Sequence, residues 1–144
     1  MTDKEIQFDI IKTEFGLCQQ QMDKYDQLSM NTKTWAITLW AASVGWSFQV
    51  SRGEVLLLSI LILAVFWFFD ALNKTFRTDY KKRRDEVALV LKHLFRNGSL
   101  PQNTTSPELP EHRWKDTLPN IFAVHIALPY LILAVVSFAL YIRF

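Results

Sequence analysis

The chain has 144 residues, which is enough for one small domain. Half of the residues are hydrophobic and 14% are aromatic, which excludes a largely disordered chain. The formal net charge of +2 is too small for binding nucleic acid by bulk charge, and the single cysteine, Cys18, excludes a disulfide framework and an all-cysteine zinc site. The hydrophobic residues are concentrated in three blocks. We therefore interpret the chain as an all-α membrane protein with three transmembrane helices.

The expected organisation has four parts. They are a cytoplasmic amphipathic helix (residues 1–33), a transmembrane helical hairpin (34–72), a cytoplasmic basic helix with an irregular loop (73–118), and a third transmembrane helix (119–144).

The first part is polar, but apolar residues recur in it at alternating intervals of three and four. This spacing is typical of a coiled-coil seam and predicts an amphipathic helix. Two interpretations are open: the helix packs on its own chain, or it associates with a second copy. The candidate oligomerisation residues on the seam are Phe8, Ile11, Phe15, Cys18, Met22 and Tyr25.

Residues 34–50 are roughly long enough to cross a bilayer, but they are only weakly hydrophobic. Small and polar side chains form one stripe along this helix, and such a stripe usually faces protein or water. If the protein conducts, the candidate pore-lining residues are Thr38, Ala41, Gly45 and Gln49. The competing explanation is a dry seam against the other two spans.

Residues 51–54 predict a tight turn, so the first two spans should form an antiparallel hairpin. The second span, 55–72, is almost uniformly aliphatic and ends in aromatic residues suited to the membrane interface. Asp70 closes this run, with Lys74 four residues later as its expected ion-pair partner. An ionisable group this close to the membrane interior is a candidate functional residue.

A basic cluster follows the second span and consists of Lys81, Lys82, Arg83 and Arg84. It could enforce orientation, bind anionic lipid headgroups, or bind a nucleotide or nucleic acid, and it is the candidate site for lipid or partner binding. Direct nucleic-acid binding is not expected, because no platform of interleaved aromatic residues accompanies the cluster. Asn97-Gly98 should stop this helix, and the prolines that come next predict an irregular loop.

The third span should begin at Pro119 and end at Tyr141, with a kink at the internal Pro129. His125 would then lie about two turns inside this span, as a second intramembrane polar residue.

The distribution of lysine and arginine predicts the orientation. Residues 1–33 carry four of them and residues 73–118 carry ten, whereas the hairpin turn and the C-terminal tail carry one each. Basic segments stay in the cytoplasm. We expect a multi-pass membrane protein with a cytoplasmic N-terminus and a C-terminus on the opposite side of the membrane.

No pattern in the sequence points to catalysis. The three histidines, His93, His112 and His125, are far apart, and neither H-E-x-x-H nor G-x-S-x-G is present. We expect neither an enzyme nor a metal site, and no cofactor.

One run carries a family resemblance: F-W-F-F-D-A-L-N-K-T-F-R-T-D-Y-K-K-R-R-D-E-V, from Phe66 to Val87. An aromatic helix end with an aspartate continues into a basic helix with a tyrosine and paired arginines. This resembles the two-span SLATT effectors of bacterial nucleotide-signalling and antiphage systems, over residues 30–95. The resemblance implies a place in the bacterial inner membrane, which makes the C-terminus periplasmic. It also implies oligomerisation and disruption of that membrane when a partner senses infection. The third span and the seam-bearing N-terminus depart from the two-span pattern.

Three functional hypotheses follow. The first is a homo-oligomeric membrane effector that forms or gates a pore in antiphage defence, with a cytoplasmic sensor or nuclease as a candidate partner. The second is a non-conducting membrane anchor that recruits a cytoplasmic complex. The third is a small transporter, for which the sequence offers little besides His125.

Overall fold

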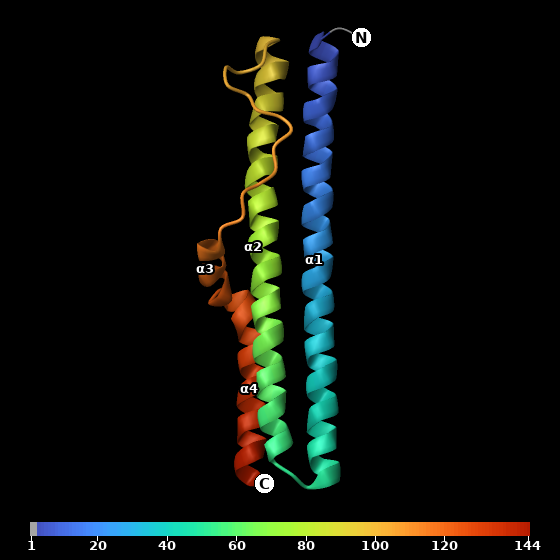
Figure 1. Cartoon of the computed structure of the whole chain (residues 1–144), viewed down its shortest axis with the longest axis vertical. Helices are drawn as coiled ribbons and strands as arrows, with labels where there is room; N and C mark the ends of the chain where they lie inside the picture. Colours follow the sequence, from blue (N-terminus) through green and yellow to red (C-terminus); the bar gives the residue numbers. More distant parts are fainter. Residues whose placement is uncertain (1–2) are drawn as a thin grey trace. The chain divides into compact units, whose positions relative to one another are not determined.

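The computed structural model describes residues 3–144, and 85% of these residues are helical, with no strand among them. Two long helices, α1 (Asp3–Val50) and α2 (Glu54–Asn97), are followed by an irregular segment and the short 3-10 helix η1 (Trp114–Asp116). A short helix, α3 (Thr117–Ile121), then precedes α4 (Val124–Arg143) (Figure 1). The predicted all-helical class is therefore confirmed.

The turn between α1 and α2 is fixed by local hydrogen bonds and by one glycine. Ser51 adopts a left-handed φ of 54°, and the Arg52 N–H donates to the Ser47 carbonyl at 3.2 Å. A Cβ on Gly53 would lie 3.1 Å from the Cβ of Phe144, so glycine allows the end of α4 to approach the turn. These contacts make the turn and the C-terminal end of α4 one packed structure.

The chain divides into two compact units. Residues 3–26 and 76–112 form one, which we call the polar unit, and residues 27–75 and 113–144 form the other, the apolar unit.

In the polar unit, the predicted seam of α1 is packed against α2 of the same chain. Tyr25 stacks on Phe76 and Tyr80 with ring centroids 5.4 and 5.9 Å apart, and Phe8 meets Phe95 edge-on at 5.7 Å. Of the seam residues, three are buried and three are half-buried: Ile11, Cys18 and Met22, then Phe8, Phe15 and Tyr25. The seam is thus packed on α2 of its own chain, and its role in self-association stays a prediction.

The core of the apolar unit joins α1, α2 and α4. Ala36, Leu63 and Tyr130 are almost fully buried and form its centre, with Trp40 packed against them. Ser137 on α4 accepts a hydrogen bond from the Trp40 indole at 2.8 Å and lies 3.1 Å from the hydroxyl of Ser59 on α2. Hydrogen bonds of this kind between helices stabilise packing in an apolar surrounding.

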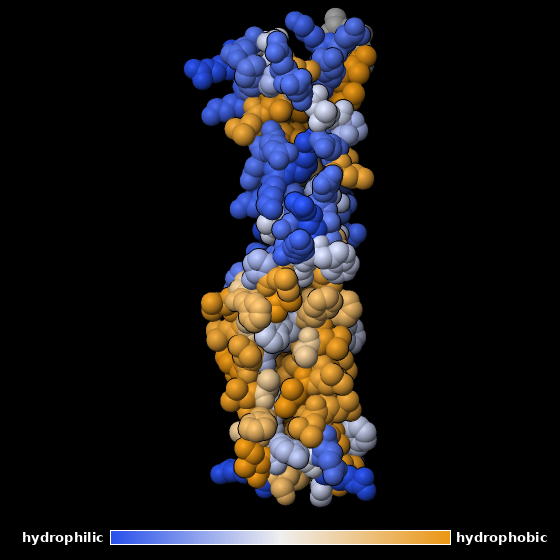
Figure 2. Space-filling model, turned by 60° about the vertical axis from the view of Figure 1, so that its left-hand side comes forward, coloured by the Kyte–Doolittle hydropathy of each residue, from blue (hydrophilic) through white to orange (hydrophobic). Residues whose placement is uncertain are grey.

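Two helices, α2 and α4, are long and apolar enough to span a membrane. Large hydrophobic side chains cover the visible face of the apolar unit (Figure 2), and many of them are more than half exposed, including Trp46, Leu61, Phe69 and Phe138. The α1 segment 34–50 does not reach the hydropathy of α2 and α4, because threonine, serine, glycine and glutamine interrupt it. The third span therefore stays a prediction.

The last apolar helix begins at Val124, five residues later than predicted. Ala123 has an extended backbone with ψ 123°, which breaks the helix, and Pro119 lies in α3 instead. His125 consequently lies in the first turn of α4 and is exposed, and not two turns inside the helix.

Candidate functional site

The predicted pore-lining stripe lies on a face of α1 that the apolar unit leaves uncovered. Thr38, Ala41, Gly45 and Gln49 are all exposed. The side of α1 that packs on the rest of the unit carries Ala36, which is 1% exposed. The helical period of 3.6 residues places the stripe on the opposite side from Ala36.

Two further observations describe this stripe. A Cβ built on Gly45 would meet nothing within 4 Å, so no other part of the described chain packs there. The Thr38 hydroxyl bonds to the Thr34 carbonyl of its own helix at 2.8 Å. The competing explanation, a dry seam against the chain's own spans, is therefore not what the structure shows for a single chain.

Large apolar side chains flank the stripe. Trp35, Leu39 and Trp46 follow it along one side, and Ile37 and Phe48 along the other, and all five are exposed. A surface of this composition suits lipid on its flanks and protein or water along its centre.

Asp70 is the second feature of the apolar unit. It is fully buried, and it contacts side chains from both other long helices of the unit. Lys33 of α1 lies 3.3 Å from its carboxylate, Ser29 donates a hydrogen bond to it, and the Tyr130 hydroxyl of α4 donates to it at 3.4 Å. The sequence predicted Lys74 as the ion-pair partner, whereas the ion pair in the structure comes from Lys33.

The arrangement around Asp70 links three helices through one buried negative charge. A buried carboxylate is tolerated when a cation and hydrogen-bond donors surround it, and removing one partner is costly. The sequence indicated Asp70 as a candidate functional residue. It could not indicate that Ser29, Lys33 and Tyr130 contact Asp70, because these three residues are distant from it in sequence. The Trp40–Ser137 contact also joins residues that are distant in sequence, and no sequence pattern predicted it.

The basic cluster does not form one cationic surface. Arg83 is half-buried and pairs with Glu14 at 2.8 Å, while Arg84 pairs with Asp85 at 2.7 Å. Lys82 lies 4.0 Å from Asp79, and Lys81 is exposed. Four consecutive residues point to different sides of a helix. The use of these four residues for lipid or partner binding stays a prediction.

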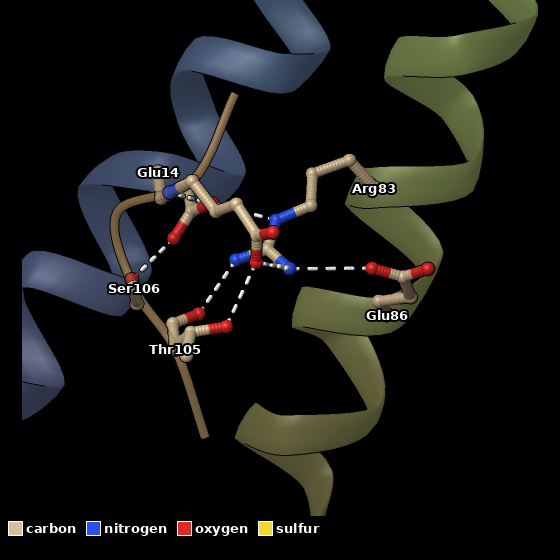
Figure 3. A network of polar contacts seen from close by, with 6 residues as sticks. Glu14, Arg83, Glu86, Thr105 and Ser106 are labelled. Atoms are coloured by element: carbon tan, nitrogen blue, oxygen red, sulfur yellow. Dashed lines mark hydrogen bonds and ion pairs between the residues drawn. The ribbon is translucent and has the colours of Figure 1, made fainter. Parts of the chain in front are cut away.

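Arg83 and Glu14 are the centre of a polar network that ties the irregular loop to the two helices (Figure 3). One Glu14 oxygen accepts from the Arg83 Nε, and the other accepts from the Ser106 hydroxyl. The Glu108 backbone N–H also donates to Glu14, at 3.2 Å, and Arg83 donates to the Thr105 carbonyl at 2.7 Å. The network fixes residues 105–108 against α1 and α2.

The network also determines the ionisation of Glu14. Burial alone would raise the pKa of this carboxyl, but the hydrogen bonds from Arg83, Ser106 and the Glu108 N–H outweigh burial and hold its pKa below the usual range. Glu14 lies three residues after Ile11 and four before Cys18, so its place on the apolar seam was a sequence signal for a buried ion pair. The sequence-based prediction did not include Glu14.

A second contact holds the end of the loop in the polar unit. The His112 ring lies 3.1 Å from the carboxylate of the buried Asp79 and 4.3 Å from the Phe76 ring centroid.

Metal ligation and thiol chemistry find no support in the described chain. Residues 3–144 contain no group of three histidine, cysteine, aspartate or glutamate side chains that could hold a metal ion. Burial raises the pKa of the Cys18 thiol, which makes it a poor nucleophile.

Comparisons with protein families, with characterised proteins and with solved structures find no match to this chain. The resemblance to the two-span effectors therefore stays a prediction.

Proposed function

We propose that this protein is a homo-oligomeric protein of the bacterial inner membrane that forms or gates a pore and acts as an effector in antiphage defence. The observation that carries the proposal is the exposed stripe of Thr38, Ala41, Gly45 and Gln49 on α1, opposite the face that packs on the rest of the apolar unit.

The position of the stripe requires more than one copy. The stripe is on the outside of the apolar unit, so a single chain cannot enclose a water-filled path with it. Several copies that turn this face toward a common axis would line a path with hydroxyl, amide and small side chains, while the flanking tryptophans and aliphatic residues meet lipid. In this arrangement α1 is the third transmembrane helix, with the N-terminus in the cytoplasm and the C-terminus in the periplasm.

Reconstitution with selectivity measurements tests the proposal. Purified protein in planar bilayers should conduct, and a charge introduced at a pore-lining position should change the reversal potential. Gln49→Lys should favour anions and Gln49→Glu should favour cations. Arg143→Gln changes a charge on α4 outside the stripe and should leave selectivity unchanged. Absence of conductance from a preparation that crosslinks as an oligomer would contradict the proposal.

A second candidate function is a non-conducting anchor, and one observation favours it. The polar unit carries a groove of about 680 Å³ between α1 and the loop, with Ile10, Leu17 and Leu109 among its walls. Leu17 and Leu109 are 53% and 81% exposed, which is a suitable surface for a cytoplasmic partner such as a sensor or a nuclease. A non-conducting protein that captures a cytoplasmic partner through this groove would support the anchor.

A further inference from the structure

A second groove lies beside the α1–α2 turn, at the end of the apolar unit. Its volume is about 700 Å³, within the usual range for ligand pockets. Apolar side chains and two opposite charges line it: Trp46, Val50, Arg52, Glu54, Val55 and Leu58.

The two charged side chains of this groove have no polar partner within the described residues. Within residues 3–144, neither the Arg52 guanidinium nor the Glu54 carboxylate makes a hydrogen bond or an ion pair, with each other or with any other group. Both side chains are exposed. Glu54 does begin α2, where a negative charge is favourable near the helix N-terminus, but this effect leaves its carboxylate oxygens available.

The backbone that carries these charges is held in place. The buried Ser47 hydroxyl donates to the Arg52 carbonyl at 3.0 Å, and Gly53 packs against Phe144 and Tyr141 of α4. A binding site on a fixed backbone loses less freedom when its ligand binds.

The apolar wall continues from these charges onto the two helices. Trp46 is 54% exposed on α1 and Leu58 is 46% exposed on α2, so both offer free hydrophobic surface. A tryptophan at the end of an apolar block is typical of the boundary between hydrocarbon and headgroups. The groove thus places a cation and an anion at headgroup level above a hydrocarbon-lined wall.

We propose that this groove binds a phospholipid whose headgroup carries both a phosphate and a primary ammonium. Arg52 holds the phosphate, because a guanidinium donates several hydrogen bonds to phosphate oxygens. Glu54 accepts hydrogen bonds from the ammonium group, which a trimethylated ammonium cannot donate. An acyl chain lies along Trp46, Val50 and Leu58. The inference rests on the membrane insertion contained in the proposed function, but not on conduction.

Lipid retention in competition tests the site. The full-length protein is purified with equimolar phosphatidylethanolamine, phosphatidylcholine and phosphatidylglycerol, and native mass spectrometry measures the retained lipid. We expect retention of phosphatidylethanolamine over phosphatidylcholine by about fivefold, the ratio for one net hydrogen bond, because the two headgroups carry the same charge and differ only in their N–H donors. Glu54→Ala, which removes the acceptor, should abolish this preference, and Arg52→Gln should lower retention of all three lipids. Arg143→Gln, a loss of a cation at the same end of the unit, should change neither.

A soluble headgroup separates lipid binding from simple ion binding. Glycerophosphoethanolamine has the same charges without acyl chains and should not displace the lipid. Displacement by this compound would contradict the acyl-chain contacts.

The failures of this inference and of the proposed function are distinguishable. Equal retention of the ethanolamine and choline lipids by the native protein, in a preparation that conducts, would overturn the lipid site alone. Release of the protein from membranes by alkaline carbonate would overturn both.

Discussion

Replacing Glu14 with glutamine should release the irregular loop from the polar unit. Glu14 accepts hydrogen bonds from Arg83, from the Ser106 hydroxyl and from the Glu108 N–H. Glutamine has the same shape, but it carries no charge, and its amide group turns one acceptor into a donor that faces another donor. The loop should therefore open more often, while the contact between α1 and α2 persists.

The magnitude follows from the burial of the pair and from the other partners of Arg83. Breaking a buried ion pair can cost about 3–5 kcal/mol. Arg83 keeps Glu86 of its own helix at 3.2 Å as a partner even when the loop opens and Glu108 leaves, so its charge does not become isolated. We expect a loss of about 2 kcal/mol, the value for a hydrogen bond to a charged group. This corresponds to about 30-fold more opening of the loop.

Hydrogen–deuterium exchange of the full chain in detergent measures this opening directly. Peptides covering residues 104–110 should exchange faster in Glu14→Gln, and the Glu108 amide reports the lost hydrogen bond itself. Glu86→Gln is the matched control, because Glu86 contacts the same Arg83 and its side chain is 65% exposed. An exposed pair contributes about 0–1 kcal/mol, so exchange should change little. Equal effects of the two substitutions would refute the central role of Glu14.

Protection of the loop should depend on pH through the ionisation of Glu14. The folded pKa of Glu14 lies below its usual value, so the stabilisation is present above the unfolded pKa of about 4.3. It is lost as the pH falls through the lowered folded pKa. Loop protection should therefore decrease below about pH 4 in the native protein, and Glu14→Gln should lack this transition.

Three more predictions concern other buried groups. Asp70→Asn should lower the thermal unfolding temperature in detergent, because Lys33 would keep a charge without its partner. Loss of one partner of a buried ion pair typically lowers stability by about 3–5 kcal/mol. An unchanged unfolding temperature would contradict the buried pair. Ser137→Ala should cost about 1–3 kcal/mol, because the half-buried Trp40 indole loses its acceptor, and a blue shift in tryptophan fluorescence without loss of stability would contradict this. Native Cys18 should react with a soluble thiol reagent only after denaturant is added, because its side chain is 4% exposed and burial raises its pKa. Rapid labelling of the native protein would show that α1 and α2 separate at this residue.

The sequence could predict those parts of the fold that depend on local pattern. Periodicity and composition predict the helical class and the apolar character of α2 and α4. Turn residues predict the tight turn at residues 51–54 and the helix stop at Asn97-Gly98. The seam on α1 was correctly predicted to be a contact face. Its partner was open, because a three-four spacing is the same for a partner in the same chain and for one in a second copy.

Contacts between distant segments could not be predicted. Asp70 has a nearby lysine in sequence, but the structure pairs it with Lys33 across the hairpin. The start of α4 was misplaced because proline at a first helical turn is a common signal, whereas the extended backbone of Ala123 has no counterpart in composition. The four residues of the basic cluster are adjacent in sequence, but successive residues of a helix are rotated by about 100°, so the four side chains do not face the same way.

Thiol accessibility along α1 tests the proposed pore wall most directly. In a Cys18→Ser background, single substitutions Thr38→Cys and Gly45→Cys place a thiol on the stripe, and Leu39→Cys and Trp46→Cys place one on its flank. In membranes where the protein conducts, the stripe positions should react readily with a membrane-impermeant thiol reagent, and the flank positions should react much more slowly because they face lipid. Equal protection of stripe and flank in a conducting protein would contradict the assignment of this face to the pore.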